Sequence, residues 1–170
     1  MERLWSTWRS DFIDGHKETQ GEESPFVRAW REPEHDAENM MVHRGESAFI
    51  IMNKYPYNPG HLLILPAREI ADPLDLDDDE WSEMMALTRY GIRLLRAALK
   101  PDGINAGMNI GVAAGAAIPR HLHYHLVPRW NGDSNFMPVL ADVRVMSKRL
   151  EDIWQVIRKA GEGVGKGSGE

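Results

Sequence analysis

Short apolar runs separated by turn-forming residues recur through the middle of the chain and predict β-strands. Arg44-Gly45-Glu46 separates the first run from the second, and the Pro- and Gly-containing stretch 55–60 separates the second from the third. The predicted strands are Met40–His43, Ala48–Asn53, His61–Pro66, Ile104–Gly111 and His121–Val127.

The clearest helix is predicted between the third and fourth strands. Asp77, followed three positions later by Glu80, has the spacing of a capping box. The apolar positions that follow recur at helical spacing and line one face: Trp81, Met84, Met85, Ile92 and Leu95. Pro101 and Gly103 predict that this helix ends near Leu99.

A second amphipathic helix is predicted over roughly residues 143–160. Its apolar positions are Val145, Leu150, Ile153, Trp154 and Ile157. Strands interrupted by one long helix indicate an α+β domain with a mainly antiparallel five-stranded sheet. We expect this domain to span residues 38–160, after an N-terminal arm (1–37) and before a Gly-rich tail (161–170).

The two ends of the chain differ from this domain in composition. Leu4, Trp5, Trp8 and Phe12 lie near helical spacing, which predicts a short helix or an arm that packs on the body. The last ten residues hold five Gly and few apolar residues, so we expect a flexible tail.

Composition then narrows the class of protein. With 170 residues, of which 42% are hydrophobic, the chain is long enough for one domain with a buried core. A net charge of −6 argues against non-specific binding to nucleic acid or to an anionic membrane. No apolar run approaches the roughly 18–20 residues that span a bilayer, and the N-terminus lacks a signal-peptide pattern, so we expect a cytoplasmic protein. The absence of Cys excludes disulfides, thiolate catalysis and cysteine-ligated zinc.

Three of the seven histidines, His121, His123 and His125, alternate with hydrophobic residues in the last predicted strand. In a strand the three imidazoles project from one side and the hydrophobic residues from the other. Three interpretations compete: polar positions on a solvated strand, a metal site, or nucleophilic and acid–base chemistry. A strand places the outer two histidines roughly 13 Å apart, which makes one shared metal ion difficult. Neutral imidazole is a nucleophile near pH 7, so we favour the third interpretation.

The distribution of charge indicates an anionic ligand. No carboxylate occurs in residues 47–68 or 104–132, and the second stretch contains Arg120 and Arg129. It also contains a Gly- and Ala-rich loop, 111–117, whose peptide N–H groups could cradle phosphate oxygens. Eight acidic residues crowd positions 69–83, and we interpret them as a solvated helix start rather than a metal site.

At this point the sequence resembles a known family. The segment from His121 to Val127 is similar to the His-φ-His-φ-His-φ-φ signature (φ, hydrophobic) of the histidine triad superfamily of nucleotidyl hydrolases and transferases. The segment from Asn53 to His61 is similar to the family's Asn…Pro-Gly-His segment. The resemblance covers roughly residues 38–160 and implies an antiparallel sheet crossed by a long helix, in a protein that usually forms a homodimer.

One branch of the superfamily resembles this chain most. Residues 108–111 and 127–136 and the N-terminal stretch 3–9 are similar to the bacterial diadenosine tetraphosphate phosphorylases. By this resemblance the substrate is an adenosine nucleotide or a dinucleoside polyphosphate, and inorganic phosphate is the second reactant. The resemblance implies no cofactor, and neither nucleic acid nor membrane is expected as a partner.

The resemblance also implies roles for single residues. His123 is the nucleophile that forms an adenylyl-imidazole intermediate, which requires its other ring nitrogen to be tied to an acceptor. His121 and His125 orient His123 and bind or protonate phosphate oxygens. The substrate-binding residues implied are Asn53 on the ribose, and Asn109, Gly111, Gly115, Ala116 and Ala117 on phosphate. The charge distribution adds Arg120 as a further substrate-binding residue. A catalytic and a structural role stay open for His61, as do shielding of the intermediate and anchoring of the sheet edge for Trp130.

Two departures from the family pattern bear on function. Many relatives hold zinc with a Cys-x-x-Cys pair, whose counterpart here is Ser24-Pro25-Phe26-Val27, so we expect no metal site. Relatives often carry a hydroxyl residue before the first triad histidine, where this chain has Ala116 and Ala117. From the resemblance to the phosphorylase branch we expect adenylyl transfer, with phosphorolysis as the leading reaction. The alternatives are hydrolysis of dinucleoside polyphosphates or nucleoside phosphoramidates, and a regulatory module that binds adenosine nucleotides with slow turnover.

Overall fold

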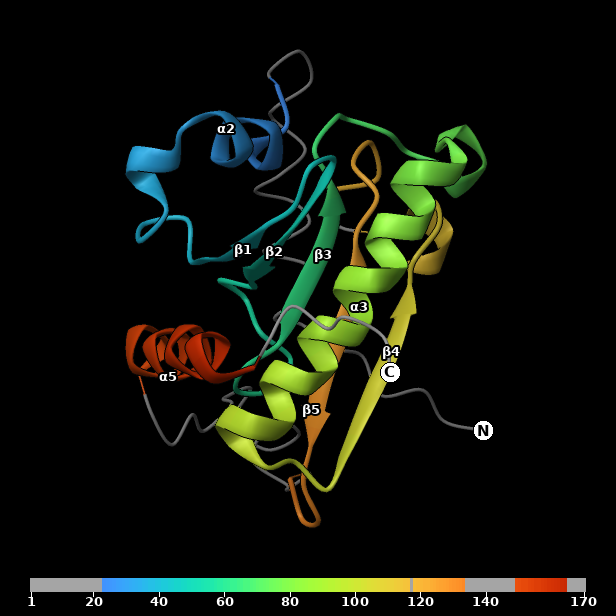
Figure 1. Ribbon diagram of the computed structural model, residues 1–170. Coiled ribbons are helices and arrows are strands. Elements are labelled where there is room, and N and C mark those ends of the chain that lie inside the picture. The colour runs from blue at the N-terminus through green and yellow to red at the C-terminus, as the bar shows by residue number, and fades with distance from the viewer. Residues whose placement is uncertain (1–22, 117, 134–148, 165–170) are drawn as a thin grey trace, which may run out of the picture.

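The computed structural model describes residues 23–116, 118–133 and 149–164, which form an antiparallel sheet with helices on both faces (Figure 1). The strands stand in the order β1-β2-β3-β5-β4, and every neighbouring pair is antiparallel. The elements in chain order are α2 (Pro25–Arg31), η1 (Pro33–His35), β1 (Met41–Arg44), β2 (Ala48–Met52), β3 (Leu62–Pro66), η2 (Pro73–Asp75), α3 (Asp78–Leu99), β4 (Gly103–Met108), η3 (Val112–Ala114), β5 (Tyr124–Arg129) and α5 (Leu150–Gly163). The predicted α+β class, the five strands and the long helix are confirmed.

The capping box and the Pro and Gly that follow the helix predict both ends of α3 to within one residue. The Asp77 side chain accepts from the peptide N–H of Glu80, and the Glu80 side chain accepts from the peptide N–H of Asp77, so the capping box forms as expected. The last strand was predicted less well. It was expected over His121–Val127, but β5 begins at Tyr124.

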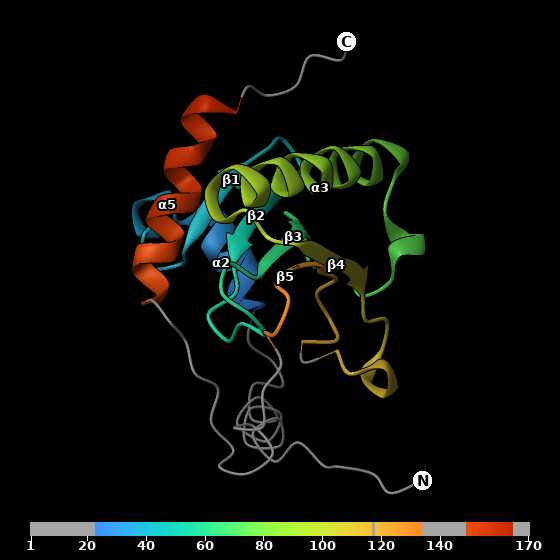
Figure 2. The same ribbon diagram turned by 90° about the horizontal axis from the view of Figure 1, so that it is seen from below.

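Helices α3 and α5 cover one face of the sheet and enclose the larger core (Figures 1 and 2). Ile50, Leu62 and Leu126 point into this core from β2, β3 and β5. A Cβ at Gly91 would lie 2.8 Å from Leu126, so α3 can approach β5 closely only because this position carries no side chain. No helix in the described ranges is both long and apolar enough to cross a bilayer.

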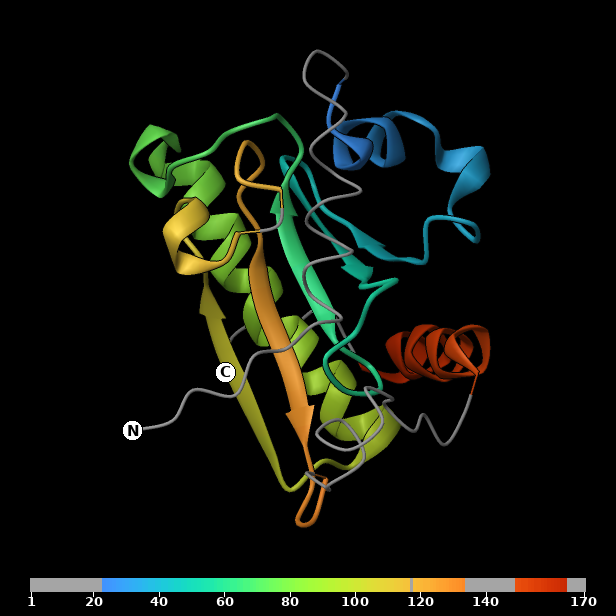
Figure 3. The ribbon, with the colours of Figure 1, turned by 180° about the vertical axis from the view of Figure 1, so that it is seen from behind.

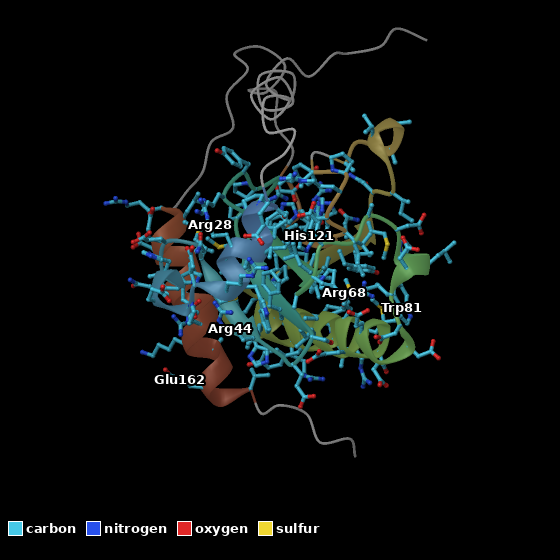
Figure 4. The ribbon with its side chains drawn as sticks, turned by 90° about the horizontal axis from the view of Figure 1, so that it is seen from above. Arg28, Arg44, Arg68, Trp81, His121 and Glu162 are labelled. Atoms are coloured by element: carbon cyan, nitrogen blue, oxygen red, sulfur yellow. The ribbon has the colours of Figure 1, made fainter. Side chains whose placement is uncertain are left out.

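Helix α2 packs on the opposite face of the sheet, where Phe26 and Trp30 cover a second apolar cluster (Figure 2). Arg44 of β1 donates to the carbonyls of Ala29 (2.9 Å) and Trp30 (2.6 Å), and thereby satisfies two carbonyls at the end of this short helix. Figure 4 labels Arg44 and His121, both of which contact α2. Viewed from behind, strands β3, β5 and β4 lie in front of α3 (Figure 3).

The predictions for the chain ends have mixed outcomes. The predicted helix around Trp5 and Trp8 lies outside the described residues, as do the stretches 143–148 and 165–170. Helix α5 continues to Gly163, so the prediction that the flexible tail starts at Gly161 was wrong. A Cβ at Gly161 would lie 3.1 Å from the Tyr90 hydroxyl, which indicates that packing on α3 holds this turn despite the low helix propensity of glycine.

Candidate active site

The histidine row lies on the α2 face of the sheet, as the alternation in sequence predicted. Tyr124 and Leu126 pack toward the core under α3 and α5. His125 pairs in register with Leu63, whose side chain lies in the opposite cluster under α2. His123 and His125 lie edge to face with ring centroids 4.8 Å apart. The two imidazoles are therefore adjacent on the face that α2 covers in part.

His121 is completely buried, and both of its ring nitrogens bind protein groups. Nε2 lies 2.9 Å from the carbonyl oxygen of Pro66, which can only accept, so Nε2 carries the hydrogen. Nδ1 lies 2.9 Å from the Ser24 hydroxyl and accepts from it. Burial lowers the pKa of His121 to about 4, although the Pro66 carbonyl and Glu69 act in the opposite direction.

A neutral, enclosed His121 ring does not fit the expected contact with phosphate oxygens. The main-chain carbonyl of His121 binds the next histidine of the row, because its oxygen lies 2.9 Å from Nδ1 of His123. That carbonyl can only accept, so His123 carries its hydrogen on Nδ1 and leaves the Nε2 lone pair without a proton. Burial also lowers the pKa of His123, so the ring is neutral at physiological pH. The nucleophile role requires the second ring nitrogen of His123 to bind an acceptor. That acceptor is the main-chain carbonyl of His121.

We expect acid to destabilise the protein through His121. The unfolded chain takes up a proton near pH 6.5, whereas the folded chain resists protonation down to about pH 4. The unfolded state therefore binds more protons in this window, and the free energy of unfolding falls as the pH falls through it. Relative to a His121→Gln variant, wild type should lose about 2–3 kcal/mol between pH 7 and pH 4.5 in denaturant titrations. A difference between the two proteins that does not change with pH would contradict the assignment.

His125 is held by a second relay of hydrogen bonds. The peptide N–H of Tyr57 lies 3.2 Å from His61 Nδ1 and can only donate, so this nitrogen accepts. Neutral His61 then carries its hydrogen on Nε2, 2.9 Å from His125 Nδ1. Neutral His125 in turn carries its hydrogen on Nε2. The relay thus leaves His125 as a hydrogen-bond donor from Nε2, beside a His123 ring whose Nε2 is an acceptor.

The turn that ends at Gly60 determines the position of His61. Gly60 has φ +81°, a conformation that residues with a Cβ rarely adopt, and a Cβ there would also collide with Leu99. Tyr57 lies over His61 with ring centroids 4.8 Å apart, and the Asn53 amide nitrogen lies 3.3 Å from His61 Nδ1. The structure therefore brings Asn53 and His61 together with the histidine row, and His61 contacts His125 directly.

The described part of the Gly- and Ala-rich loop, residues 111–116, is held by hydrogen bonds between its own residues and to Asn109. Gly111 and Gly115 both have positive φ, and Asn109 Nδ2 donates to the carbonyl of Gly115 (3.3 Å). The peptide N–H groups of Ala114, Gly115 and Ala116 donate to carbonyls within the loop, at 3.2, 2.9 and 3.4 Å. These three N–H groups are thus engaged inside the protein. The expected phosphate contacts of Asn109, Gly111, Gly115 and Ala116 stay predictions, and Ala117 lies outside the described residues.

The charge distribution predicts Arg120 and Arg129 in surroundings without acids, and this prediction is wrong. Glu69 lies 3.3 Å from Nε of Arg120, and Asp133 binds Arg129 through two hydrogen bonds of 2.6 and 2.8 Å. The hydrogen bond from Arg129, with smaller contributions from the Trp130 N–H and Asn58, holds the pKa of Asp133 well below its usual range. Both acids lie just outside the stretches that lack carboxylates, and the fold brings them back to the arginines.

Trp130 lies far along β5 from the histidine row. It follows the last residue of the strand, and its peptide N–H donates to Asp133 (3.1 Å) in the turn that ends β5. Trp130 lies five positions after His125, which corresponds to about 16 Å along a strand. This distance fits the anchoring role for Trp130 better than the shielding role.

Three residues of this site were not identified from the sequence. Ser24 and Phe26 of the α2 region contact His121, and Glu69 accepts from the peptide N–H of Ser24 (2.9 Å). A serine followed by Pro25 is a typical helix start, so the sequence contained a signal for α2 itself. No local signal relates Ser24 to a histidine 97 positions later.

The sheet, the crossing helix and the histidine row together have the architecture of the histidine triad class. The chain belongs to the HIT domain family, whose model matches residues 34–132. A Mycobacterium tuberculosis protein named AP-4-A phosphorylase is 36% identical over 156 residues, which are 89% of this chain and 80% of that protein. The asymmetrical bis(5'-nucleosyl)-tetraphosphatase of Schizosaccharomyces pombe is 27% identical over 56% of this chain and 52% of its own.

Solved structures agree with this assignment. A hypothetical histidine triad nucleotide-binding protein from Sulfolobus tokodaii matches with a TM-score of 0.65 and 28% identity, over 81% of this chain and 91% of that one. A zinc-bound histidine triad family protein from Mycobacterium smegmatis matches with a TM-score of 0.63 and 26% identity, over 79% of this chain and 90% of that one.

Proposed function

We propose that this protein transfers the adenylyl group of an adenosine polyphosphate through a covalent intermediate on His123. The observation that carries the proposal is the hydrogen bond from His123 Nδ1 to the His121 carbonyl, which leaves a neutral nitrogen lone pair on Nε2. That nitrogen attacks the α-phosphorus, and the bond from the α-phosphorus to the bridging oxygen breaks. The polyphosphate leaves with the electron pair of the broken bond.

In this reaction His125 assists the departure of the leaving group. Its Nε2–H, oriented by the bond between its Nδ1 and His61, donates to the bridging oxygen as negative charge develops there. This hydrogen bond stabilises the leaving oxygen in place of the hydroxyl residue of relatives, where this chain has Ala116 and Ala117. Asn53, already beside His61, is proposed to contact the ribose.

Inorganic phosphate is the proposed acceptor of the adenylyl group. The similarity to AP-4-A phosphorylase over most of the chain supports this choice over water. Attack by phosphate on the intermediate releases ADP and regenerates the neutral imidazole. The whole reaction then converts diadenosine tetraphosphate and phosphate into ATP and ADP.

Product analysis tests this choice. We expect the purified protein to convert diadenosine tetraphosphate into ATP and ADP at a rate that rises with phosphate concentration, as followed by ion-exchange chromatography. Phosphate labelled with ¹⁸O should appear in ADP and not in ATP. Formation of ATP and AMP at a phosphate-independent rate would contradict phosphorolysis and identify a hydrolase. Binding without products would contradict the enzyme and identify the regulatory module.

We also propose that the protein is a homodimer in which two β4 strands pair. Strand β4 is at one edge of the sheet, and each of its residues is at least partly exposed. Such an edge presents main-chain groups that another chain can pair with, and two-fold dimers are the commonest assemblies. Light scattering at micromolar concentration should give twice the chain mass of 19.3 kDa. A mass of one chain would contradict the dimer.

A further inference from the structure

The contact between Ser24 and His121 links two distant parts of the chain. Ser24 is completely buried and lies at the N-cap of α2, where its side chain also accepts from the peptide N–H of Phe26 (3.3 Å). Its own peptide N–H donates to Glu69 (2.9 Å), a residue of the connection that follows β3. The Phe26 ring then meets the His121 ring edge to face, with centroids 5.3 Å apart.

These contacts fix the tautomer of the His121 ring. Nε2 donates to the Pro66 carbonyl, so Nδ1 requires a donor, and the Ser24 hydroxyl supplies it. Without that donor, the nitrogen would lose a hydrogen bond at a fully buried position. Holding the His121 ring in place also holds the main chain of His121. The carbonyl of this main chain accepts the hydrogen bond that orients His123. Ser24 is therefore two hydrogen bonds away from the proposed nucleophile.

Zinc does not fit this position in the chain. By the resemblance described above, Ser24–Val27 stands where many relatives carry a zinc-holding Cys-x-x-Cys pair. The Mycobacterium smegmatis neighbour is zinc-bound. A hydroxyl and a valine offer no thiolate, and the hydrogen on His121 Nε2 points to a carbonyl. Within the described ranges, no three His, Asp or Glu side chains are grouped so that they could hold a metal ion.

We propose that Ser24 is a positioning residue that replaces the metal: its hydroxyl, with Glu69 on its peptide N–H, clamps the start of α2 onto His121 and thereby orients His123. This proposal rests on the proposed function only for its kinetic consequence. The orientation itself is a property of the free protein and can be observed without substrate.

The proposal is tested with Ser24→Ala and Ser24→Gly. Glycine is nearly as good as serine at an N-cap, so Ser24→Gly removes the hydroxyl while largely preserving the start of α2. We expect both variants to lower kcat about 10–100-fold with little change in KM, because the nucleophile is misplaced. The amplitude of the pre-steady-state burst counts competent sites and separates a slower site from a smaller folded fraction.

Asp77→Ala is the matched control, because it removes the N-cap of α3 on the other face of the sheet. It should lower stability and leave the rate per competent site unchanged. Equal rates per site for the Ser24 variants and wild type would overturn the proposal, and so would an equal loss in Asp77→Ala.

Nitrogen-15 NMR of the imidazoles supplies the readout that needs no turnover. In wild type we expect the hydrogen on Nε2 of His121 and on Nδ1 of His123, with slow exchange of the latter. In Ser24→Gly the His121 Nδ1 resonance should shift and the His123 Nδ1 hydrogen should exchange faster. Unchanged spectra would overturn the clamp. If wild type shows this NMR pattern but forms no adenylyl-enzyme, the clamp stands and the proposed function fails.

Discussion

Replacing His123 with alanine is expected to lower kcat at least about 10³-fold, the largest effect of any single change in this protein. The variant has no nitrogen at the position from which Nε2 attacks, so the covalent route is lost rather than slowed. Nucleotide affinity should change little, because the proposed phosphate and ribose contacts lie on other residues. Initial rates with diadenosine tetraphosphate, and calorimetry with a non-hydrolysable analogue, measure the two quantities.

The exposed His35 provides the control for this variant. It pairs with Glu38 on the surface, and His35→Ala should retain the wild-type rate. Thermal unfolding checks that His123→Ala is folded, since removal of a ring that is 7% exposed leaves a cavity and an unused carbonyl on His121. A folded His123→Ala protein with near-normal turnover would show that another group is the nucleophile.

The second large effect is expected from His61→Phe, which should lower kcat about 10²-fold with KM nearly unchanged. Phenylalanine has a similar ring for the fully buried site and keeps the packing on Tyr57. It removes the donor to His125 Nδ1, so the hydrogen of His125 is no longer confined to Nε2. Departure of the leaving group, no longer stabilised by a hydrogen bond from His125, then becomes the slow step.

A substrate with an activated leaving group distinguishes this mechanism from damage to the fold. The 4-nitrophenyl ester of AMP releases an anion that is stable without a hydrogen-bond donor, so His61→Phe should process it at close to the wild-type rate. His35→Phe, the same exchange at the surface, should leave both substrates unaffected. If His61→Phe lost activity equally on both substrates, the relay to His125 would not be the cause.

Local patterns predicted the parts of the fold that depend on near neighbours. Asp77 and Glu80 lie three positions apart, and the helix begins at the expected place. The alternation around His125 correctly placed Tyr124 and Leu126 toward the helices, because a strand permits only two faces.

The parts that sequence reasoning missed depend on distant partners. His121 and His123 alternate like strand residues, but the peptide N–H of Leu122 donates to the Ile70 carbonyl, and Ser24 and Pro66 hold the His121 ring. No periodicity records such contacts, because each partner arrives from another part of the fold.

The distribution of acidic residues along the sequence likewise does not reveal partners that arrive from elsewhere in the fold. The stretch 104–132 lacks acids, yet Glu69 reaches Arg120 from outside it. An absence of carboxylates in sequence therefore did not mean an absence in space.

Direct capture of the adenylyl-enzyme is the measurement that tests the central claim most directly. Enzyme is mixed with diadenosine tetraphosphate in phosphate-free buffer, quenched within milliseconds under alkaline denaturing conditions that preserve a phosphoramidate, and analysed by intact mass and peptide mapping. We expect wild type to gain one AMP moiety, mapped to His123, and His123→Ala to gain none. Added phosphate should discharge the adduct as ADP. Rapid turnover by wild type without an adduct, or an adduct that maps to another residue, would contradict the account.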